Sequence, residues 1–565
     1  MRSYINIYAI LLIVFSSLVA CNDLNLDPLS QGSSNNWYNN EVEINMSVND
    51  LYKDAFWGLD NTEWTDDWIY RESLTPITSA TINGEWGTIN SIWANSYKAI
   101  TRSNTLIQNL ESGEINIPAE LVQQYIAEAK FVRASQFAKL VSHFGDVVYF
   151  TNTLDLDEAY SLAKTDKETV LEAIYADYDE AIESLPVSYS GSEISRATKG
   201  AAMAFKARIA LYSGDWDIAR DAAKECMDLE QYSLYPNYEE IFYPSTGKTD
   251  ETIFSIPRSE ELNSYNGDAR NYLPRNSGGW AAKDPSWDLL CAYTCTDGLP
   301  IDESPLFDPQ NPFENRDPRC GYTIVPFQTP MLGIMYQPHP DSTMVLNVNS
   351  GQYQTNNDTR SNQQYASFNG LIWKKGITQD WSDNFREDSD IILMRYADVM
   401  LMYAEAKIEL GEIDESVHQA INSIRARAYN VDITDAESYP AVTTQDQDEL
   451  RRIIRLERRM EFALEGLRYM DLIRWRLAEK ALNRPNYGML DVAELKEKVV
   501  DQGLWFFPST PEIDEDGIAD FSEMADAGLI KQLTNRQFDA SRQYLWPIPT
   551  KEVLINDNLE QNPGY

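Results

Sequence analysis

Residues 196–216 have the sequence RATKGAAMAFKARIALYSGDW, and this stretch decides the fold of the chain. Its alanines recur at the spacing of one helix face, and Gly214 ends the helical pattern shortly before Trp216 begins another. The same order returns in residues 404–428, AEAKIELGEIDESVHQAINSIRARA, with Gly411 in the place of Gly214. Both stretches therefore predict two helices joined by a glycine-centred turn.

Small residues let two helices approach closely, and here they resemble those of a tetratricopeptide (TPR) unit. The alternative is a set of ordinary helical hairpins. Residues 230–390 are instead rich in Asn, Ser, Pro, Gly and Tyr, with short apolar runs at residues 252–256 and 321–325. We predict a mainly α fold, a TPR-like helical hairpin scaffold with this long loop-rich insertion and a few short strands. The hairpins are expected around residues 91–144, 196–229, 394–428 and 450–482.

The N-terminus carries an apolar stretch, IYAILLIVFSSLVA, after Arg2. It is too short to span a bilayer and predicts a signal peptide over residues 1–20. The following LVAC resembles the lipobox of bacterial lipoproteins, which implies that Cys21 carries lipid and starts the mature chain. The alternative is an ordinary secretory signal with a cysteine nearby by chance. We expect a flexible, lipid-anchored segment over residues 21–40 and one helical domain over residues 41–565.

The formal net charge is −41 at pH 7. Such an acidic balance argues against nucleic acid and against a polyanionic substrate, and it favours neutral or cationic partners. Four cysteines besides Cys21 are too few for a disulfide framework in a chain of this length, so we expect one bridge at most.

Several charged residues at helical spacing have a structural interpretation. Arg395 and Asp398 lie on one helix face, beside a stripe of apolar residues. Opposite charges also alternate along residues 457–474. We predict a buried or partly buried ion network that joins helices, and the less favoured alternative is contact with carbohydrate. Its members would be Glu457, Arg458, Glu461, Glu465, Arg468, Asp471 and Arg474.

Two loop regions combine aromatic and hydrogen-bonding side chains. They are residues 60–72 (DNTEWTDDWIYRE) with the nearby NGEWG at residues 83–87, and residues 272–287, where glycines would allow close approach to a ligand. A sugar needs a flat aromatic face for its C–H side and polar groups for its hydroxyls. For any single tryptophan, core packing is the alternative. The candidate ligand residues are Trp64, Asp66, Asp67, Trp68, Arg71, Trp86 and Trp280.

An acidic stretch near the C-terminus resembles an EF-hand calcium loop. Gly517 occupies the position of the loop glycine. Against this, the first ligand is Glu instead of Asp, and Pro508 and Pro511 forbid a regular entering helix. The alternative is a solvated acidic turn, and no cofactor is required by any other motif. The tentative calcium ligands are Glu512, Asp514, Asp516, Asp520 and Glu523.

Nine segments, in order behind the lipobox, resemble the SusD/RagB family of surface glycan-binding lipoproteins. The resemblance covers nearly the whole mature chain, and its motifs include NRDPR at residues 315–319, MRYADVMLMYAEA at 394–406 and LERRMEFALEGLRYMDLIRW at 456–475. It implies a non-catalytic protein that binds oligosaccharides, partners a SusC-like TonB-dependent transporter and is exposed on the outer membrane. Asn22, where Asp would signal inner-membrane retention in some species, agrees with that location.

Two other functions remain as alternatives. Helical repeats often bind peptides, so the chain would be a peptide-binding or structural lid of the transporter. A glycoside hydrolase needs only two carboxylates, although no nucleophile elbow, histidine metal motif or phosphate loop is present in the sequence.

Overall fold

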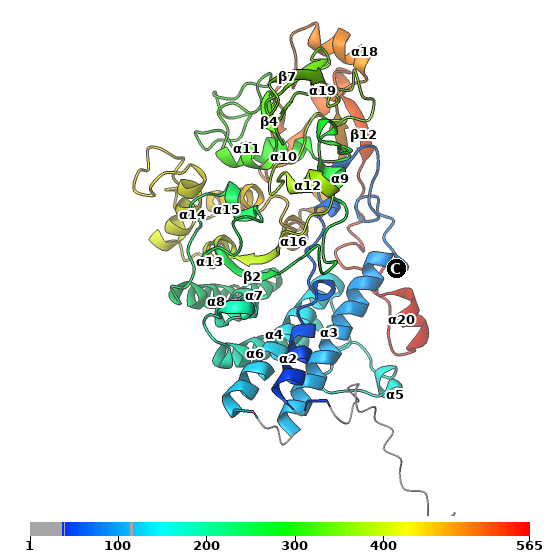
Figure 1. Cartoon of the computed structure of the whole chain (residues 1–565), viewed down its shortest axis with the longest axis vertical. Helices are drawn as coiled ribbons and strands as arrows, with labels where there is room; N and C mark the ends of the chain where they lie inside the picture. The colour runs from blue at the N-terminus through cyan, green and yellow to red at the C-terminus, as the bar shows by residue number, and fades with distance from the viewer. Residues whose placement is uncertain (1–36, 39, 113–116) are drawn as a thin grey trace, which may run out of the picture.

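The computed structural model describes residues 37–38, 40–112 and 117–565. The predicted signal peptide, Cys21 and most of the segment 21–40 lie outside the described residues. The described chain is mainly helical, as predicted, with five small β-sheets (Figure 1). No helix in these ranges is long and apolar enough to cross a membrane.

The first predicted hairpin consists of α3 (Gly87–Ser112) and α4 (Ala119–Phe144). Helix α3 buries a single stripe, whereas α4 is buried over most of its second half because it packs against both α3 and α6 (Lys167–Ser184). Helix α6 was not predicted from the sequence. The shorter α2 (Glu41–Asp50) packs against α3 and α4.

The second and third hairpins are α7 (Lys199–Ser213) with α8 (Trp216–Asp228), and α13 (Tyr396–Leu410) with α14 (Glu415–Ala428). Gly214 and Gly411 end the first helix of each pair in the left-handed region, with φ of 81° and 71°. Glycine adopts this conformation without steric strain, so the predicted turns are confirmed. Helix α8 packs against α13 across the insertion, so the hairpins form one continuous stack.

The fourth predicted hairpin is only partly correct. Helix α15 (Gln447–Glu461) packs against α13, but α16 (Arg468–Arg474) and α17 (Ala478–Ala481) are short, and α16 packs against α7. Gly466, between α15 and α16, has a φ of 76°, and a Cβ there would lie 2.6 Å from the Asp60 carbonyl oxygen. Because Gly466 has no Cβ, the loop that contains Leu59 and Asp60 can approach this turn closely.

The strands form short antiparallel sheets. β1 (Trp68–Tyr70) pairs with β3 (Lys283–Pro285), β2 (Thr252–Ile256) with β8 (Ile391–Arg395), β9 (Pro485–Gly488) with β12 (Lys531–Asn535), and β10 (Glu512–Ile513) with β11 (Ala519–Asp520). A four-stranded sheet follows the order β4 (Thr329–Met331), β5 (Ile334–Tyr336), β6 (Met344–Asn347) and β7 (Gln352–Thr355). The run at 252–256 is a strand as expected. The run at 321–325 is not, because α11 (Pro318–Thr323) occupies most of it.

The remaining elements are short. The short α-helices are α5 (Leu156–Ala159), α9 (Ala269–Tyr272), α10 (Trp287–Ala292), α12 (Asp380–Asn384), α18 (Val492–Leu495), α19 (Ser522–Asp526) and α20 (Thr550–Ile555). The described 3₁₀ turns are η1 (Asp54–Phe56), η2 (Thr62–Trp64), η3 (Gly191–Glu193), η4 (Glu239–Phe242) and η5 (Arg275–Ser277). The turn η6 (Lys496–Val500) is π-helical. Much of the insertion and the C-terminal segments around β12 lie in the upper half of the molecule, and α20 returns beside α3 in the lower half (Figure 1).

A buried ion network joins α15 and α16 to their neighbours, as predicted. Arg458 bonds Asp398 of α13 and Asp471 of α16, and Arg474 bonds Glu405. The predicted shared helix face of Arg395 and Asp398 is wrong, because Arg395 is the last residue of β8 and only caps α13. Arg395 does not pair with Asp398 but bonds Glu251, Glu461 and Glu465. Truncating one member of such a buried pair leaves the other charge without compensation, which costs about 3–5 kcal/mol.

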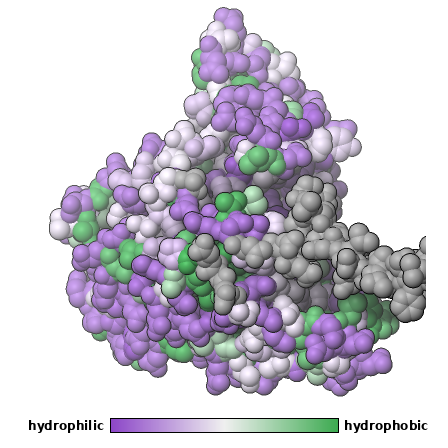
Figure 2. Space-filling view, turned by 60° about the horizontal axis from the view of Figure 1, so that its bottom comes forward, coloured by the Kyte–Doolittle hydropathy of each residue, from purple (hydrophilic) through white to green (hydrophobic). Residues whose placement is uncertain are grey.

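The four cysteines of the described chain are buried, free thiols. Figure 2, which brings the lower end of Figure 1 forward, shows a mostly hydrophilic surface with separate hydrophobic patches. This agrees with acidic residues dispersed over a solvated globular surface.

Candidate functional site

Strands β1 and β3 bring two of the predicted ligand residues together. Tyr70 pairs with Lys283 in the antiparallel register, so Arg71 follows one strand at the end where Trp280 precedes the other. The Arg71 Nη2 group donates a hydrogen bond to the Trp280 carbonyl oxygen at 2.9 Å. Two residues that are far apart in the sequence thus meet at one end of a small sheet.

Further arginines and rings surround this contact. The Arg71 guanidinium lies 5.3 Å from the centroid of the Tyr365 ring. The Arg270 guanidinium lies over two rings, 5.0 Å from the centroid of Trp280 and 4.6 Å from that of Phe385. Arg275 donates from Nε and Nη2 to the Tyr365 carbonyl oxygen at 3.0 and 2.9 Å. We call this the aromatic–arginine cluster, which comprises Arg71, Arg270, Arg275, Trp280, Tyr365 and Phe385.

Two rings of the cluster are open to solvent. Trp280 is 42% exposed and Tyr365 is 48% exposed. An exposed aromatic face suits the apolar side of a sugar ring, and guanidinium N–H groups beside it suit oxygen acceptors. Arg71 and Trp280 are therefore the predicted ligand residues that the structure places together and leaves accessible.

The backbone of the cluster is strained at three places. Arg71, Ala281 and Phe385 have φ of 45°, 42° and 62°, in a region that residues other than glycine rarely adopt. Gly279 is also required, because a Cβ there would lie 2.1 Å from the Leu273 carbonyl oxygen. Strain of this kind persists only where the surrounding structure imposes it, and it concentrates at functional sites.

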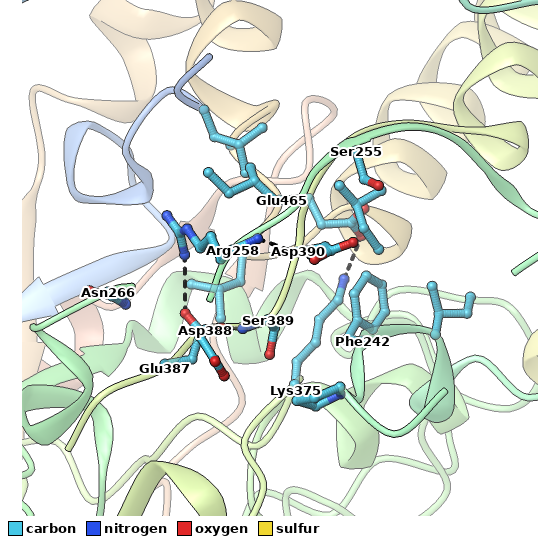
Figure 3. Close-up of a pocket in the computed structure, with 18 of the residues that line it drawn as sticks. Phe242, Ser255, Arg258, Asn266, Lys375, Glu387, Asp388, Ser389, Asp390 and Glu465 are labelled. Carbon is cyan, nitrogen blue, oxygen red and sulfur yellow. Dashed lines mark hydrogen bonds and ion pairs between the residues drawn. The ribbon is translucent and has the colours of Figure 1, made fainter. Parts of the chain in front are cut away.

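A cleft of about 880 Å³ lies beside the cluster (Figure 3). Two helices connect the cleft and the cluster. Helix α9 contributes Arg270 to the cluster and Tyr272 to the cleft wall, and α12 contributes Trp381 to the wall and is followed directly by Phe385. The Tyr272 and Trp381 rings lie edge to face, 6.3 Å apart. The cleft and the cluster thus share two helices.

Charged groups in the cleft are mostly paired. Arg258 bonds Glu387 at 3.2 Å, and the Lys375 Nζ bonds Glu465 at 2.6 Å (Figure 3). Burial lowers the pKa of Lys375 to about 8, although Glu465 opposes this shift. Three neutral polar groups of the lining are buried without a hydrogen-bond partner among the described residues, and such groups suit a hydroxylated ligand. They are the Ser255 hydroxyl, the Ser389 hydroxyl and the Trp381 indole N–H.

Two buried carboxyl groups lie near the cluster. Burial raises the pKa of Asp284 to about 8, with Arg71 and Arg275 opposing the shift. Burial also raises the pKa of Asp358 to about 6, although the backbone N–H of Arg275 donates to it. Asp284 forms no ion pair within the described residues, and the Ser367 hydroxyl opposes the rise in its pKa only in part. Asp284 is therefore largely protonated at neutral pH.

The ligand prediction is wrong for Asp66, Asp67 and Trp68. Asp66 and Asp67 are completely buried and pair with Arg459, and Asp66 also pairs with Arg468. Trp68 is 4% exposed and packs in the core beneath the cluster. The sequence pattern could not reveal this, because the arginines that pair with these aspartates are 392 to 402 residues away.

Trp64 and Trp86 lie in a different place. Trp64 is buried against Trp86, Tyr469 and Trp546, with ring centroids 5.1–6.0 Å apart. The two predicted tryptophans also line a separate hollow of about 540 Å³. Core packing, the alternative noted for single tryptophans, therefore describes Trp64, and neither residue belongs to the aromatic–arginine cluster.

The acidic C-terminal stretch does not form an EF-hand. Residues 512–520 form the β10–β11 hairpin, in which the Asp514 carboxylate accepts backbone N–H bonds from Asp516 and Ile518. Lys480 pairs with both aspartates. No group of three or more His, Cys, Asp or Glu side chains that could hold a metal exists in the described residues. These residues therefore do not fit a calcium ion.

Four members of the cluster were missed by the sequence analysis. Arg275 lies within the stretch 272–287, which the sequence analysis selects for its tryptophan and glycines, and Arg270 lies two residues before that stretch. Tyr365 and Phe385 belong to the loop-rich insertion, which was expected to carry function but offered no pattern to select them. Only the folded chain brings these loops together.

Together, the helical stack and the exposed cluster on its loop-rich insertion define a ligand-binding protein built on TPR-like hairpins. Two family models match the chain. The model of the SusD family matches residues 242–565, and a model described as starch-binding, associating with outer membrane, matches residues 21–211. The chain therefore belongs to the SusD family.

Known relatives agree with this assignment. The chain is 25% identical to SusD-like protein P2 of Formosa agariphila over the full length of both. A SusD-like carbohydrate binding protein from Bacteroides fragilis has a similar structure, with 27% identity, a TM-score of 0.76, and coverage of 93% of this chain and 99% of that one. A laminarin binding SusD-like protein shares the fold at 20% identity and a TM-score of 0.65, over 94% of this chain and all of that one.

Proposed function

We propose that this chain is a non-catalytic, surface-exposed glycan-binding protein that captures oligosaccharides at the aromatic–arginine cluster. The observation that carries the proposal is the pair of half-exposed rings, Trp280 and Tyr365, held beside arginines on a strained backbone. Membership of the SusD family supports it, as does the carbohydrate-binding description of the relative from B. fragilis.

Capture and release follow from this arrangement. Stacking on two exposed rings gives moderate affinity, because part of the saccharide stays in water. The neighbouring cleft, with its neutral donors and hydroxyls, would hold the continuing part of a longer chain. We further propose that the ligand passes to a SusC-like TonB-dependent transporter, with Cys21 as the lipid anchor and the segment 21–40 as the tether.

Calorimetric titration of the mature chain against a polysaccharide panel tests the binding function. The incubated sugars should then be analysed for cleavage. Affinity without cleavage is the expected result. Cleavage of a bound glycan would show an enzyme, and affinity for peptides with none for glycans would favour the peptide-binding alternative.

The anchor and the partner need separate tests. Labelling of cells with radioactive palmitate should mark the wild-type chain and not the Cys21→Ala variant. Protease added to intact cells should degrade the wild-type chain if it is exposed. Gentle detergent extraction should recover a TonB-dependent transporter with the wild-type chain, and failure to do so would remove the delivery step from the proposal.

A further inference from the structure

We infer that the saccharide bound at the aromatic–arginine cluster carries negative charge, as uronate carboxylates or sulfate esters. The inference rests on the proposed glycan-binding function and adds the chemical class of the ligand. It begins from the three arginines of the cluster, which lack the partners that arginine has elsewhere in this protein.

Most arginines in the described residues form ion pairs with carboxylates, as Arg319, Arg395 and Arg458 do in the core. The arginines of the cluster do not. Arg71 donates to the Trp280 carbonyl, Arg270 to that of Gly278, and Arg275 to that of Tyr365. Within the described ranges, no carboxylate oxygen lies within 4.0 Å of their guanidinium nitrogens.

Other unpaired arginines of the described chain have simpler explanations. Arg316 is buried and donates to three main-chain carbonyls. Arg452 and Arg476 are single arginines: Arg452 donates a hydrogen bond to the Glu515 carbonyl oxygen, and the Arg476 guanidinium lies over the Tyr544 ring. Among the arginines that the structure describes, only those of the cluster converge on one accessible surface.

The guanidinium groups of Arg71 and Arg270 lie close enough to Arg275 to repel it. Burial lowers the pKa of Arg275, and the positive charges of Arg71 and Arg270 lower it further. Asp358 opposes this shift in the pKa of Arg275, whereas burial keeps Asp284 largely protonated at neutral pH, so the nearby acids compensate only in part. A bound anion would relieve this repulsion, whereas a neutral sugar would leave it in place.

The orientation of the arginines also fits an anion. A guanidinium group whose flat face lies over an aromatic ring can still donate hydrogen bonds from the N–H groups at its edge. Arg71 lies over Tyr365 in this way, and Arg270 lies over Trp280 and Phe385. A planar fork of donors matches carboxylate and sulfate oxygens. The exposed faces of Trp280 and Tyr365 would then take the sugar ring that carries the charge.

This local arrangement runs against the charge of the whole chain. A net charge of −41 argues against polyanions, as the sequence analysis concluded. Charges farther away than about 8 Å are screened at physiological salt, so the arginines decide the interaction inside the site. The surplus negative charge elsewhere has a useful consequence, because it suppresses non-specific binding of anionic polymers.

The test compares anionic glycans with neutral counterparts of the same backbone. The mature chain is titrated at pH 7.5 and about 0.15 M salt with polygalacturonate and alginate, each beside its methyl ester. Chondroitin sulfate and carrageenan are each titrated beside the desulfated form, in which any uronates are also esterified. We expect at least one anionic polymer to bind ten-fold or more tightly than its neutral form. This preference should shrink as the salt concentration rises.

Variants locate the effect. Arg270→Gln and Arg71→Gln should each weaken binding of the anionic polymer at least five-fold more than they weaken binding of its neutral form. Arg270→Lys, which keeps the charge, should restore part of the preference. The matched control is Arg452→Gln, an exposed arginine without an ion pair far from the cluster, and it should change neither.

Each outcome decides the inference. Neutral forms that bind as tightly as the anionic ones would overturn the charged ligand and leave the glycan-binding function intact. The same conclusion follows if folded cluster variants weaken both forms equally. Absence of binding to every polymer in both forms would reject the proposed function itself.

Discussion

Asp66 and Arg468 form a buried, two-pronged ion pair between residues 402 positions apart in the sequence. Arg468 Nε lies 2.9 Å from Oδ1 and Nη2 lies 2.8 Å from Oδ2. Burial alone would raise the pKa of Asp66, yet Arg459 and Arg468 hold it below its usual range. The pair joins the chain just before β1 to α16, and it thereby positions Arg71 five residues later.

We predict that Asp66→Asn destabilises the protein and does not remove a ligand contact. Loss of the carboxylate leaves Arg468 and Arg459 buried without full compensation, which lowers the free energy of unfolding by about 3 kcal/mol. Urea unfolding measures this change. The control Asp217→Asn alters a carboxylate that is 73% exposed, and it should change stability by less than about 1 kcal/mol. A fully stable Asp66→Asn protein that no longer binds glycan would show that Asp66 contacts the ligand after all.

Removal of the Trp280 side chain should weaken glycan binding without unfolding the protein. The ring is exposed, so Trp280→Ala loses the stacking face and the contact with Arg270 and leaves the core intact. We expect the dissociation constant to rise at least ten-fold, which corresponds to about 1.4 kcal/mol. Calorimetric titration gives the affinity, and Tyr353→Ala, at a ring that is 71% exposed outside the cluster, serves as the control. Equal losses in both variants would argue against a localised site.

A methyl group at Gly279 should disrupt the cluster from within. The added Cβ would lie 2.1 Å from the Leu273 carbonyl oxygen, so the backbone under Trp280 has to move. We expect Gly279→Ala to lower the free energy of unfolding by about 1–3 kcal/mol and to weaken glycan binding. Gly87→Ala is the control, because its Cβ would meet nothing within 4 Å. Unchanged binding in a folded Gly279→Ala protein would separate this loop from the ligand site.

Asp284 should make the stability of the protein depend on pH. Its pKa is about 8 in the folded chain against 3.8 as the reference, so the folded state holds a proton that the unfolded state has already released between these values. The contribution of Asp284 to the free energy of unfolding is fully present below about pH 3.8. It falls as the pH rises towards 8, by up to about 1.4 kcal/mol per pH unit. Asp284→Asn should remove that slope.

The comparison of wild type and variant isolates Asp284 from other titrating groups. Urea unfolding at several values between pH 5 and 9 should show the Asn variant gaining relative stability as pH rises. A constant difference between the two proteins across this range would show that Asp284 does not titrate there.

The sequence by itself determined the scaffold. The alanine spacing of residues 196–216 and the left-handed turns at Gly214 and Gly411 are local properties, because helix periodicity and the steric freedom of glycine act within a few residues. The charge pattern of residues 457–474 likewise predicted a structural ion network. The short α16 shows where packing against distant segments outweighed the local pattern. Helix α6 differs, because its buried residues recur at helical spacing and the local signal for it is present in the sequence.

Only the tertiary structure decided the site. Asp66, Asp67 and Arg71 lie within six residues of one another and are equally polar, yet Arg459 and Arg468 bury the first two and β1 carries the third to the surface. Tyr365 and Phe385 come from loops without a periodic pattern. Long-range contacts select which of several suitable side chains face the solvent together, and no local pattern in the sequence records those contacts.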